Sequence, residues 1–180
     1  MKIDKNQPKS EIYKIILRTE IPEPEKDPDT GELYTTEIPG EINGLAIKKL
    51  NEPMKALASF YSAMGGSYCS NDHCNLTTEL DLGKQGSKKH KNLIQKYFPN
   101  DKVAEAVIKQ DCYLRPSGAS TFSDYEFLTI LDKGDTITVD YRLMYYDHGE
   151  ISWAKGPDIY LFKDNKFKKI KRNLWTFIEK

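Results

Sequence analysis

A strict alternation of side chains between residues 121 and 147 constrains the fold more than any other feature. Apolar positions recur at every second residue on both sides of Lys133-Gly134, most clearly at Ile137, Val139 and Tyr141. A period of two places alternate side chains on opposite faces of a strand, and a glycine suits the tight turn of a hairpin. Shorter runs at 151–154, 159–162 and 167–177 continue the pattern. Residues 121–178 are therefore predicted to form an antiparallel meander.

The middle of the chain, residues 51–112, follows a helical period instead. Asn51 stands where a helix cap belongs, and Leu57, Phe60, Tyr61 and Met64 follow at helical spacing. Ser87 is the expected cap of a second helix, and Asp101 is that of a third, which should end near Cys112. Residues 1–50 predict a β arm, in which a strand over 11–20 is met by a second strand over 33–38 after a proline-rich loop.

The composition limits the class of protein. A chain of 180 residues suits one domain, 1–180, and its 27 basic and 27 acidic side chains leave no net charge to attract nucleic acid. No apolar stretch is long enough to span a membrane, and residues 1–10 lack the apolar core of a signal peptide. The compartment stays open between the cytoplasm and a periplasmic or secreted location with a leader removed.

The order of elements resembles the NTF2-like superfamily. The resemblance rests on the helix through residues 57–64, the helical pair over 87–112, and the hairpins around 132–135 and 163–166. It implies an α+β fold of the NTF2-like or cystatin-like kind, with helices packed on a curved antiparallel sheet, to which the N-terminal β-hairpin arm is an addition. Because such folds include both enzymes and non-catalytic binding domains, the resemblance implies little about function.

The polar segment after Gly65-Gly66 carries a candidate disulfide between Cys69 and Cys74. A metal site of Cys69, His73 and Cys74, completed by His90 or Cys112, is disfavoured because only one ligand cluster is visible. We therefore expect neither a metal nor a cofactor. A Cys-His hydrolase of the amidase or peptidase type is the catalytic alternative. In it Cys69 or Cys74 attacks, His148 is the base, and Asp158 or Asp147 orients the histidine.

Charge is distributed unevenly along the chain. Eight acidic residues lie between Glu20 and Glu41, whereas 84–96 and 163–172 are basic. Either the acidic arm lies over the protein's own basic face, or these surfaces meet a charged protein partner. The lysines chosen as candidate partner contacts are Lys168, Lys169 and Lys171.

Aromatic side chains are concentrated in the same meander, and they suit a ligand pocket as well as a protein interface. The aromatic candidates for binding are Tyr141, Tyr145, Tyr160 and Trp153. The function expected from these observations is a non-catalytic binding domain acting through a protein partner or a small ligand. A bacterial toxin-neutralising (immunity) protein would be one instance. The hydrolase and a structural envelope protein remain the alternatives.

Overall fold

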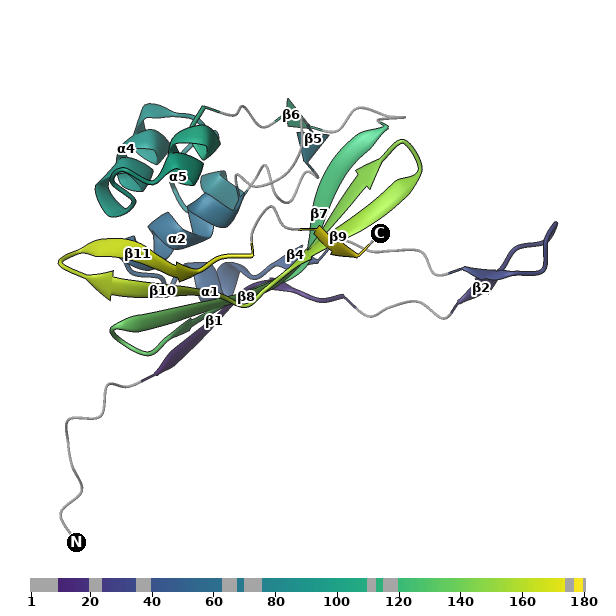
Figure 1. Cartoon of the computed structure of the whole chain (residues 1–180), viewed down its shortest axis with the longest axis horizontal. Helices are drawn as coiled ribbons and strands as arrows, with labels where there is room; N and C mark the ends of the chain where they lie inside the picture. The colour runs from purple at the N-terminus through teal and green to yellow at the C-terminus, as the bar shows by residue number, and fades with distance from the viewer. Residues whose placement is uncertain are drawn as a thin grey trace, which may run out of the picture.

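The computed structural model describes residues 10–19, 24–34, 40–62, 68–69, 76–109, 113–114, 120–173 and 177–179. It has an α+β fold in which an open, mostly antiparallel sheet carries its helices on one face (Figure 1). This confirms the expected fold class at that level. Among the described residues, no helix has the length and apolar character needed to cross a membrane.

The centre of the sheet is the hairpin predicted from the alternation. Strands β7 (Thr121–Asp132) and β8 (Thr136–Asp147) pair from Thr121 opposite Asp147 to Asp132 opposite Ile137. Gly134 has a φ of 86°, which only glycine adopts at little cost. The alternate β8 residues Ile137, Val139, Tyr141 and Leu143 are all buried on the side of the helices.

The next two strands behave as one strand with a break. Both β9 (Glu150–Lys155) and β10 (Asp158–Lys163) pair antiparallel with β8, on its later and earlier halves respectively. The break is Gly156-Pro157, where a Cβ on Gly156 would lie 2.9 Å from the Val139 carbonyl oxygen. Strand β11 (Lys166–Lys171) pairs with β10 at one edge, and β12 (Phe177–Glu179) pairs with β9. The predicted antiparallel sheet over 121–178 is confirmed, but its order differs from a simple meander, because β9 and β10 share β8 as a neighbour and the predicted run 167–177 is divided between β11 and β12.

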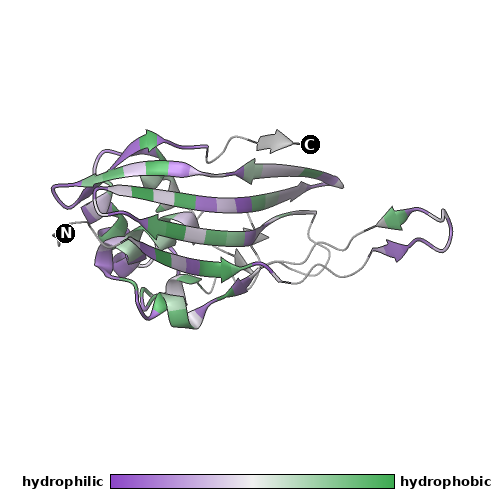
Figure 2. Cartoon of the chain, turned by 90° about the horizontal axis from the view of Figure 1, so that it is seen from below, coloured by the Kyte–Doolittle hydropathy of each residue, from purple (hydrophilic) through white to green (hydrophobic). Residues whose placement is uncertain are grey.

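The N-terminal region differs from the expectation. Strand β1 (Glu11–Leu17) joins the main sheet between β7 and the two-residue strand β4 (Glu41–Ile42). The expected return of the second strand, 33–38, onto the first is wrong for residues 33–34, since β1 pairs with β7 and β4 instead, and residues 35–38 lie outside the described residues. Instead, β3 (Leu33–Tyr34) pairs with β2 (Glu25–Lys26) in a separate hairpin. This hairpin projects away from the body (Figures 1 and 2).

The helices begin where the caps predicted. Asn51 accepts a hydrogen bond from the Met54 amide at the start of α2 (Glu52–Ser62), and Ser87 caps α4 (Lys88–Tyr97). Asp101 caps α5 (Lys102–Val107), which ends earlier than expected in a turn at 108–109. A short α1 (Gly44–Ile47) and a helical turn at 76–79 complete this layer, and α2 packs against α4. Strand β5 (Tyr68–Cys69) runs parallel to β6 (Tyr113–Leu114) and β7.

Candidate functional site

The densest polar cluster of the described residues is buried between α2 and the sheet, around Asp158. The Asp158 carboxylate accepts hydrogen bonds from the Tyr61 hydroxyl at 2.5 Å, the Tyr141 hydroxyl at 3.2 Å and the Asn173 amide at 2.6 Å. Three donors on a fully buried carboxylate satisfy it without a direct ion pair. The cluster therefore joins the helix layer to β10 and to the chain after β11.

Two tyrosines connect this carboxylate to a buried cation. The Arg172 Nε donates to the Tyr160 hydroxyl at 3.1 Å, and the Tyr160 and Tyr61 hydroxyl oxygens are 2.8 Å apart. Because Tyr61 uses its only proton on Asp158, Tyr160 must donate to Tyr61. In the chain Arg172–Tyr160–Tyr61–Asp158, each group therefore donates to the next, from the cation to the anion.

The same arginine anchors α5. Its side chain is only 4% exposed and forms two hydrogen bonds with the Asp101 carboxylate, at 2.8 and 3.2 Å. The guanidinium also lies 4.9 Å from the centre of the Phe60 ring. Asp101 at the same time caps α5 by accepting from the Val103 and Ala104 amides. One side chain therefore couples a helix start, an aromatic core residue and the tyrosine cluster.

Burial keeps the tyrosines of this cluster protonated. It raises the pKa of Tyr160 to about 12 and that of Tyr61 well above its usual value, with the neighbouring carboxyl acting in the same direction on Tyr61. Burial also raises the pKa of Asp158, against the opposing effect of its hydrogen bonds from Tyr61 and Asn173. The groups are paired with one another and shielded from water, so we assign this cluster to stability rather than to catalysis.

The aromatic candidates from the sequence lie in different environments. Tyr141 and Tyr160 are core residues whose hydroxyls serve the Asp158 cluster, so in this conformation they do not line an accessible pocket. Tyr145 is half-buried on β8. Trp153 is 7% exposed, and the Arg142 guanidinium covers its ring at 3.9 Å. The structure does not bring these four side chains together.

The lysine candidates are all exposed on one edge. Lys168, Lys169 and Lys171 lie on β11, which has a neighbouring strand on only one side in the described sheet. Ile170 between them is 59% exposed. None of the three lysines has a carboxylate within 4.0 Å in the part of the chain that the structure describes. We call residues 166–171 the lysine edge.

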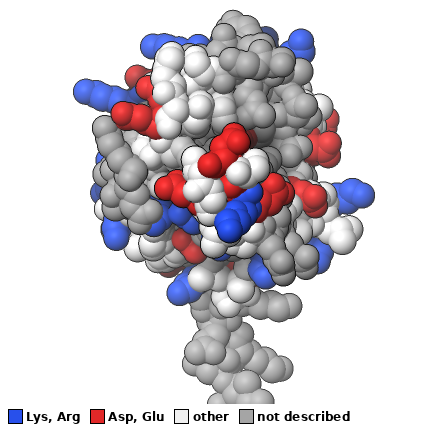
Figure 3. All heavy atoms as spheres, turned by 90° about the vertical axis from the view of Figure 1, so that its right-hand side faces the viewer, with Lys and Arg blue, Asp and Glu red and all other residues white. Residues whose placement is uncertain are grey.

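The acidic arm does not cover this edge. The β2–β3 hairpin exposes Glu25, Asp29 and Glu32 and projects from another part of the molecule (Figures 1 and 2). Figure 3 looks onto the end from which the arm projects and shows acidic side chains gathered near its centre. Backbone hydrogen bonds from Thr30 and Asp29 lower the pKa of Asp27 in the turn. The described part of the acidic arm therefore does not lie over the lysine edge, while Glu20, Glu23 and Glu37 fall outside the described residues.

The hydrolase residues are only partly described. His148 lies in an exposed turn, and its Nδ1 is 2.6 Å from the Asp147 carboxylate. Asp158 pairs with Val139 near the other end of β8, nine residues before His148 and so about 30 Å away at about 3.3 Å per residue, and it does not orient His148. The backbone of Cys69 lies beside Ser123 of β7. The Cys69 side chain and all of Cys74 lie outside the described residues, so the nucleophile and the disulfide stay predictions.

The metal alternative can be checked at one ligand. His90 is fully buried in α4, where its Nδ1 accepts a hydrogen bond from the Gly86 amide at 3.1 Å. Burial lowers the pKa of His90 to about 4. Within the described ranges no three His, Cys, Asp or Glu side chains lie close enough to hold a metal ion, and His73, Cys74 and Cys112 fall outside those ranges.

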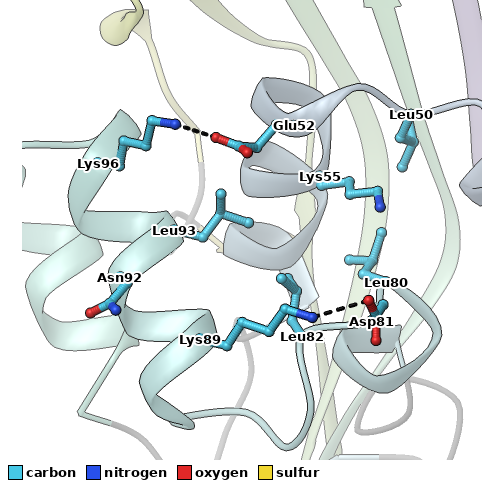
Figure 4. A pocket seen from close by; sticks show the side chains of 10 residues that line it. All are labelled: Leu50, Glu52, Lys55, Leu80, Asp81, Leu82, Lys89, Asn92, Leu93 and Lys96. Atoms are coloured by element: carbon cyan, nitrogen blue, oxygen red, sulfur yellow. Dashed lines mark hydrogen bonds and ion pairs between the residues drawn. The ribbon is translucent and has the colours of Figure 1, made fainter.

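A pocket of about 440 Å³ lies between α2, α4 and the turn at 80–82 (Figure 4). Its wall contains four leucines, three lysines and two carboxylates, namely Leu50, Leu80, Leu82, Leu93, Lys55, Lys89, Lys96, Glu52 and Asp81, together with Asn92. Sequence reasoning missed it, since its residues come from three segments and no local pattern marks them.

The charged groups of the pocket are paired unequally. Lys96 bonds to Glu52, and Lys89 lies 3.0 Å from Asp81. The Lys96 hydrogen bond is the largest cause of the lowered pKa of Glu52, and the charge of Lys55 adds a small contribution. Lys55 itself has no carboxylate within 4.0 Å among the described residues. Its charge also lowers the pKa of Asp81, after the larger effects of the Lys89 hydrogen bond and charge, so Lys55 faces both carboxylates without forming a direct ion pair with either.

Comparisons with family models, with curated proteins and with solved structures returned no match for this chain.

Proposed function

We propose that this chain is a non-catalytic binding domain that captures a protein partner on the lysine edge. The observation that carries the proposal is an edge strand whose lysines face solvent without a carboxylate partner among the described residues. The buried groups of the Asp158 cluster, in contrast, are hydrogen-bonded to one another. An acidic surface on a partner protein would supply the negative charges that these lysines do not find among the described residues of this chain.

Geometry favours an acidic segment in extended conformation. The outer edge of β11 offers backbone groups that a further strand can pair with, and lysines are a common means of keeping such an edge from pairing with the wrong chain. An acidic strand would add main-chain hydrogen bonds to charge attraction. Ile170 would supply a central apolar contact.

The NTF2-like arrangement belongs to the same proposal. Helices on one face of a long-stranded antiparallel sheet support it, while the Asp158 cluster fills space in which such a cone could hold a ligand. A domain with a filled interior and a charged edge suits neutralisation of another protein. A bacterial immunity protein is therefore the instance that we propose to test first.

The experiment compares two charge reversals of equal size. The test variant carries Lys168→Glu, Lys169→Glu and Lys171→Glu, and the control carries Lys48→Glu, Lys49→Glu and Lys102→Glu at other exposed positions. Proteins captured by the wild type are identified, purified and titrated against each variant. We expect the test variant to lose affinity and salt dependence while the control keeps both. Equal affinities of both variants would contradict the proposal.

A further inference from the structure

The pocket between α2 and α4 has the features of a small-molecule site. Its volume of about 440 Å³ lies within the range of about 300–1,000 Å³ that is usual for ligand pockets. Leu80 and Leu82 are buried, and Leu93 is partly buried against the core, so leucines form part of the lining, beside six polar or charged residues. Figure 4 shows Lys55 reaching toward the space between Leu50, Leu80 and Asp81.

The walls are fixed before any ligand arrives. The Ser87 hydroxyl donates to the Leu82 carbonyl at 2.7 Å, which ties the turn at 80–82 to the start of α4. The Gly86 amide donates to His90, which is itself buried in the core side of α4. On the opposite wall Glu52 accepts hydrogen bonds from both Lys96 and Tyr97, joining α2 to α4. A preformed pocket loses little entropy when it binds.

Charge selects the kind of ligand. The three lysines of the wall exceed its two carboxylates by one, and both carboxylates already have a lysine partner. Lys55 is a half-buried residue, whereas the side chains of Lys89 and Lys96 are more than half exposed. A cationic ligand would have to displace one of these ion pairs. An anionic group can approach Lys55 without breaking either.

We propose that this pocket binds a small amphipathic anion, with its apolar body on the leucines and its acidic head group on Lys55. This site is separate from the lysine edge on β11 and does not depend on the function proposed above. The shared chemistry is an acid head group on a short hydrocarbon chain. A carboxylate and a phosphate head group both meet it.

The test titrates the purified chain with defined probes at low salt. Decanoate is the main probe, decyl phosphate varies the acid, and decanol and acetate each lack one half of the proposed recognition. We expect saturable one-to-one binding of decanoate or decyl phosphate, with the tighter one identifying the head group. Decanol should bind at least about tenfold more weakly, and acetate should not saturate. Equal binding of decanol and the acids, or no saturable binding of either acid, would overturn the proposal.

Substitution locates the head group. Lys55→Met keeps most of the length of the side chain but removes its charge. We expect it to lower the affinity for the acid probe by about fivefold to tenfold. Lys102→Met, an exposed position outside the pocket, is the matched control and should bind as the wild type. Methyl signals of Leu80, Leu82 and Leu93 should shift during the titration. Unchanged binding by Lys55→Met, or shifts confined to other residues, would contradict the assignment.

Discussion

The Asp158 cluster and the lysine edge both contain several charged groups, but those of the cluster are buried and hydrogen-bonded, whereas those of the edge are exposed to solvent. In the cluster, Asp158, Arg172 and Asp101 each form several hydrogen bonds to protein groups. At the edge, Lys168, Lys169 and Lys171 face water without a carboxylate partner within the described chain. The interior charges join helices to sheet, whereas the edge charges contribute little to the folded state and remain available for binding.

Physical chemistry explains why the two regions differ. A buried ion is costly to desolvate, so it is retained only where hydrogen bonds compensate, and removal of one partner leaves the others unsatisfied. An exposed lysine keeps its hydration and contributes about 0–1 kcal/mol even when paired. Substitutions should therefore affect stability in the cluster and binding at the edge.

The largest expected effect on stability comes from Asp158→Asn. The amide nitrogen that replaces one carboxylate oxygen is a hydrogen-bond donor, so it would face the Tyr61 hydroxyl or the Asn173 amide, which are donors too. The substitution also removes the buried negative charge of the cluster. We expect a loss of about 3–4 kcal/mol in the free energy of unfolding, measured with urea. Asp140→Asn, at an exposed position of β8, is the control and should cost less than about 0.5 kcal/mol. Similar losses in both variants would remove the distinction between the regions.

Arg172→Met should have the next largest effect. Methionine fills part of the space over the Phe60 ring but cannot donate to Asp101 or Tyr160. The expected loss is about 2–3 kcal/mol, smaller than for Asp158 because Asp101 is partly exposed and still caps α5. Lys171→Met, one residue earlier and exposed, is the matched control. An equal effect of the two substitutions would argue against a structural role for Arg172.

His90 gives a pH dependence with a defined sign. Its folded pKa of about 4 lies below the value of 6.5 expected in the unfolded chain, so the unfolded chain binds the proton more readily. This contribution to stability is complete above about pH 6.5 and is lost as the pH falls toward 4. Between pH 7 and pH 5 the wild type should lose about 2 kcal/mol from this group.

His90→Gln isolates that contribution. Burial raises the pKa of Asp158, so the stability that Asp158 contributes falls as the pH rises, which is the opposite direction to His90. This contribution is the same in the wild type and in the variant. The difference in unfolding free energy between wild type and variant should therefore shrink as the pH is lowered from 7 to 5. A difference that stays constant with pH would show that His90 does not titrate as a buried neutral group.

The smallest effect on stability is expected from the triple reversal of Lys168, Lys169 and Lys171. These side chains are exposed and have no described carboxylate partner, so the unfolding free energy should change by less than about 0.5 kcal/mol. Thermal and urea unfolding beside the control reversal of Lys48, Lys49 and Lys102 would check this. A loss of more than about 2 kcal/mol would mean that the lysine edge also supports the fold.

Local patterns predicted the elements well, because the interactions behind them lie close in the sequence. The alternation around Lys133-Gly134 became the β7–β8 hairpin, and Ser87 and Asp101 cap the helices that they were expected to cap. The pairing of residues 33–34 was misjudged, since the partners of β1 come from distant segments. A periodic pattern shows which residues alternate, and it does not show which strand lies beside them.

The sites were harder to predict for the same reason. Tyr61, Asp101, Asp158 and Arg172 come from four separate segments, and nothing near each of them in the sequence marks the others. Tyr141 and Tyr160 were singled out for their amphipathic rings, but their hydroxyls find partners in the core. The exposure of the lysines on β11 was easier to predict, because charged side chains are seldom buried without a partner.

Amide hydrogen exchange with and without a captured, purified partner tests the central claim most directly. If the partner adds to the lysine edge, the amides of β11 should become protected on binding, while those of the β7–β8 hairpin, already paired within the sheet, should change little. Protection confined to the acidic β2–β3 arm or to the helices, with β11 exchanging as in the free protein, would contradict the account.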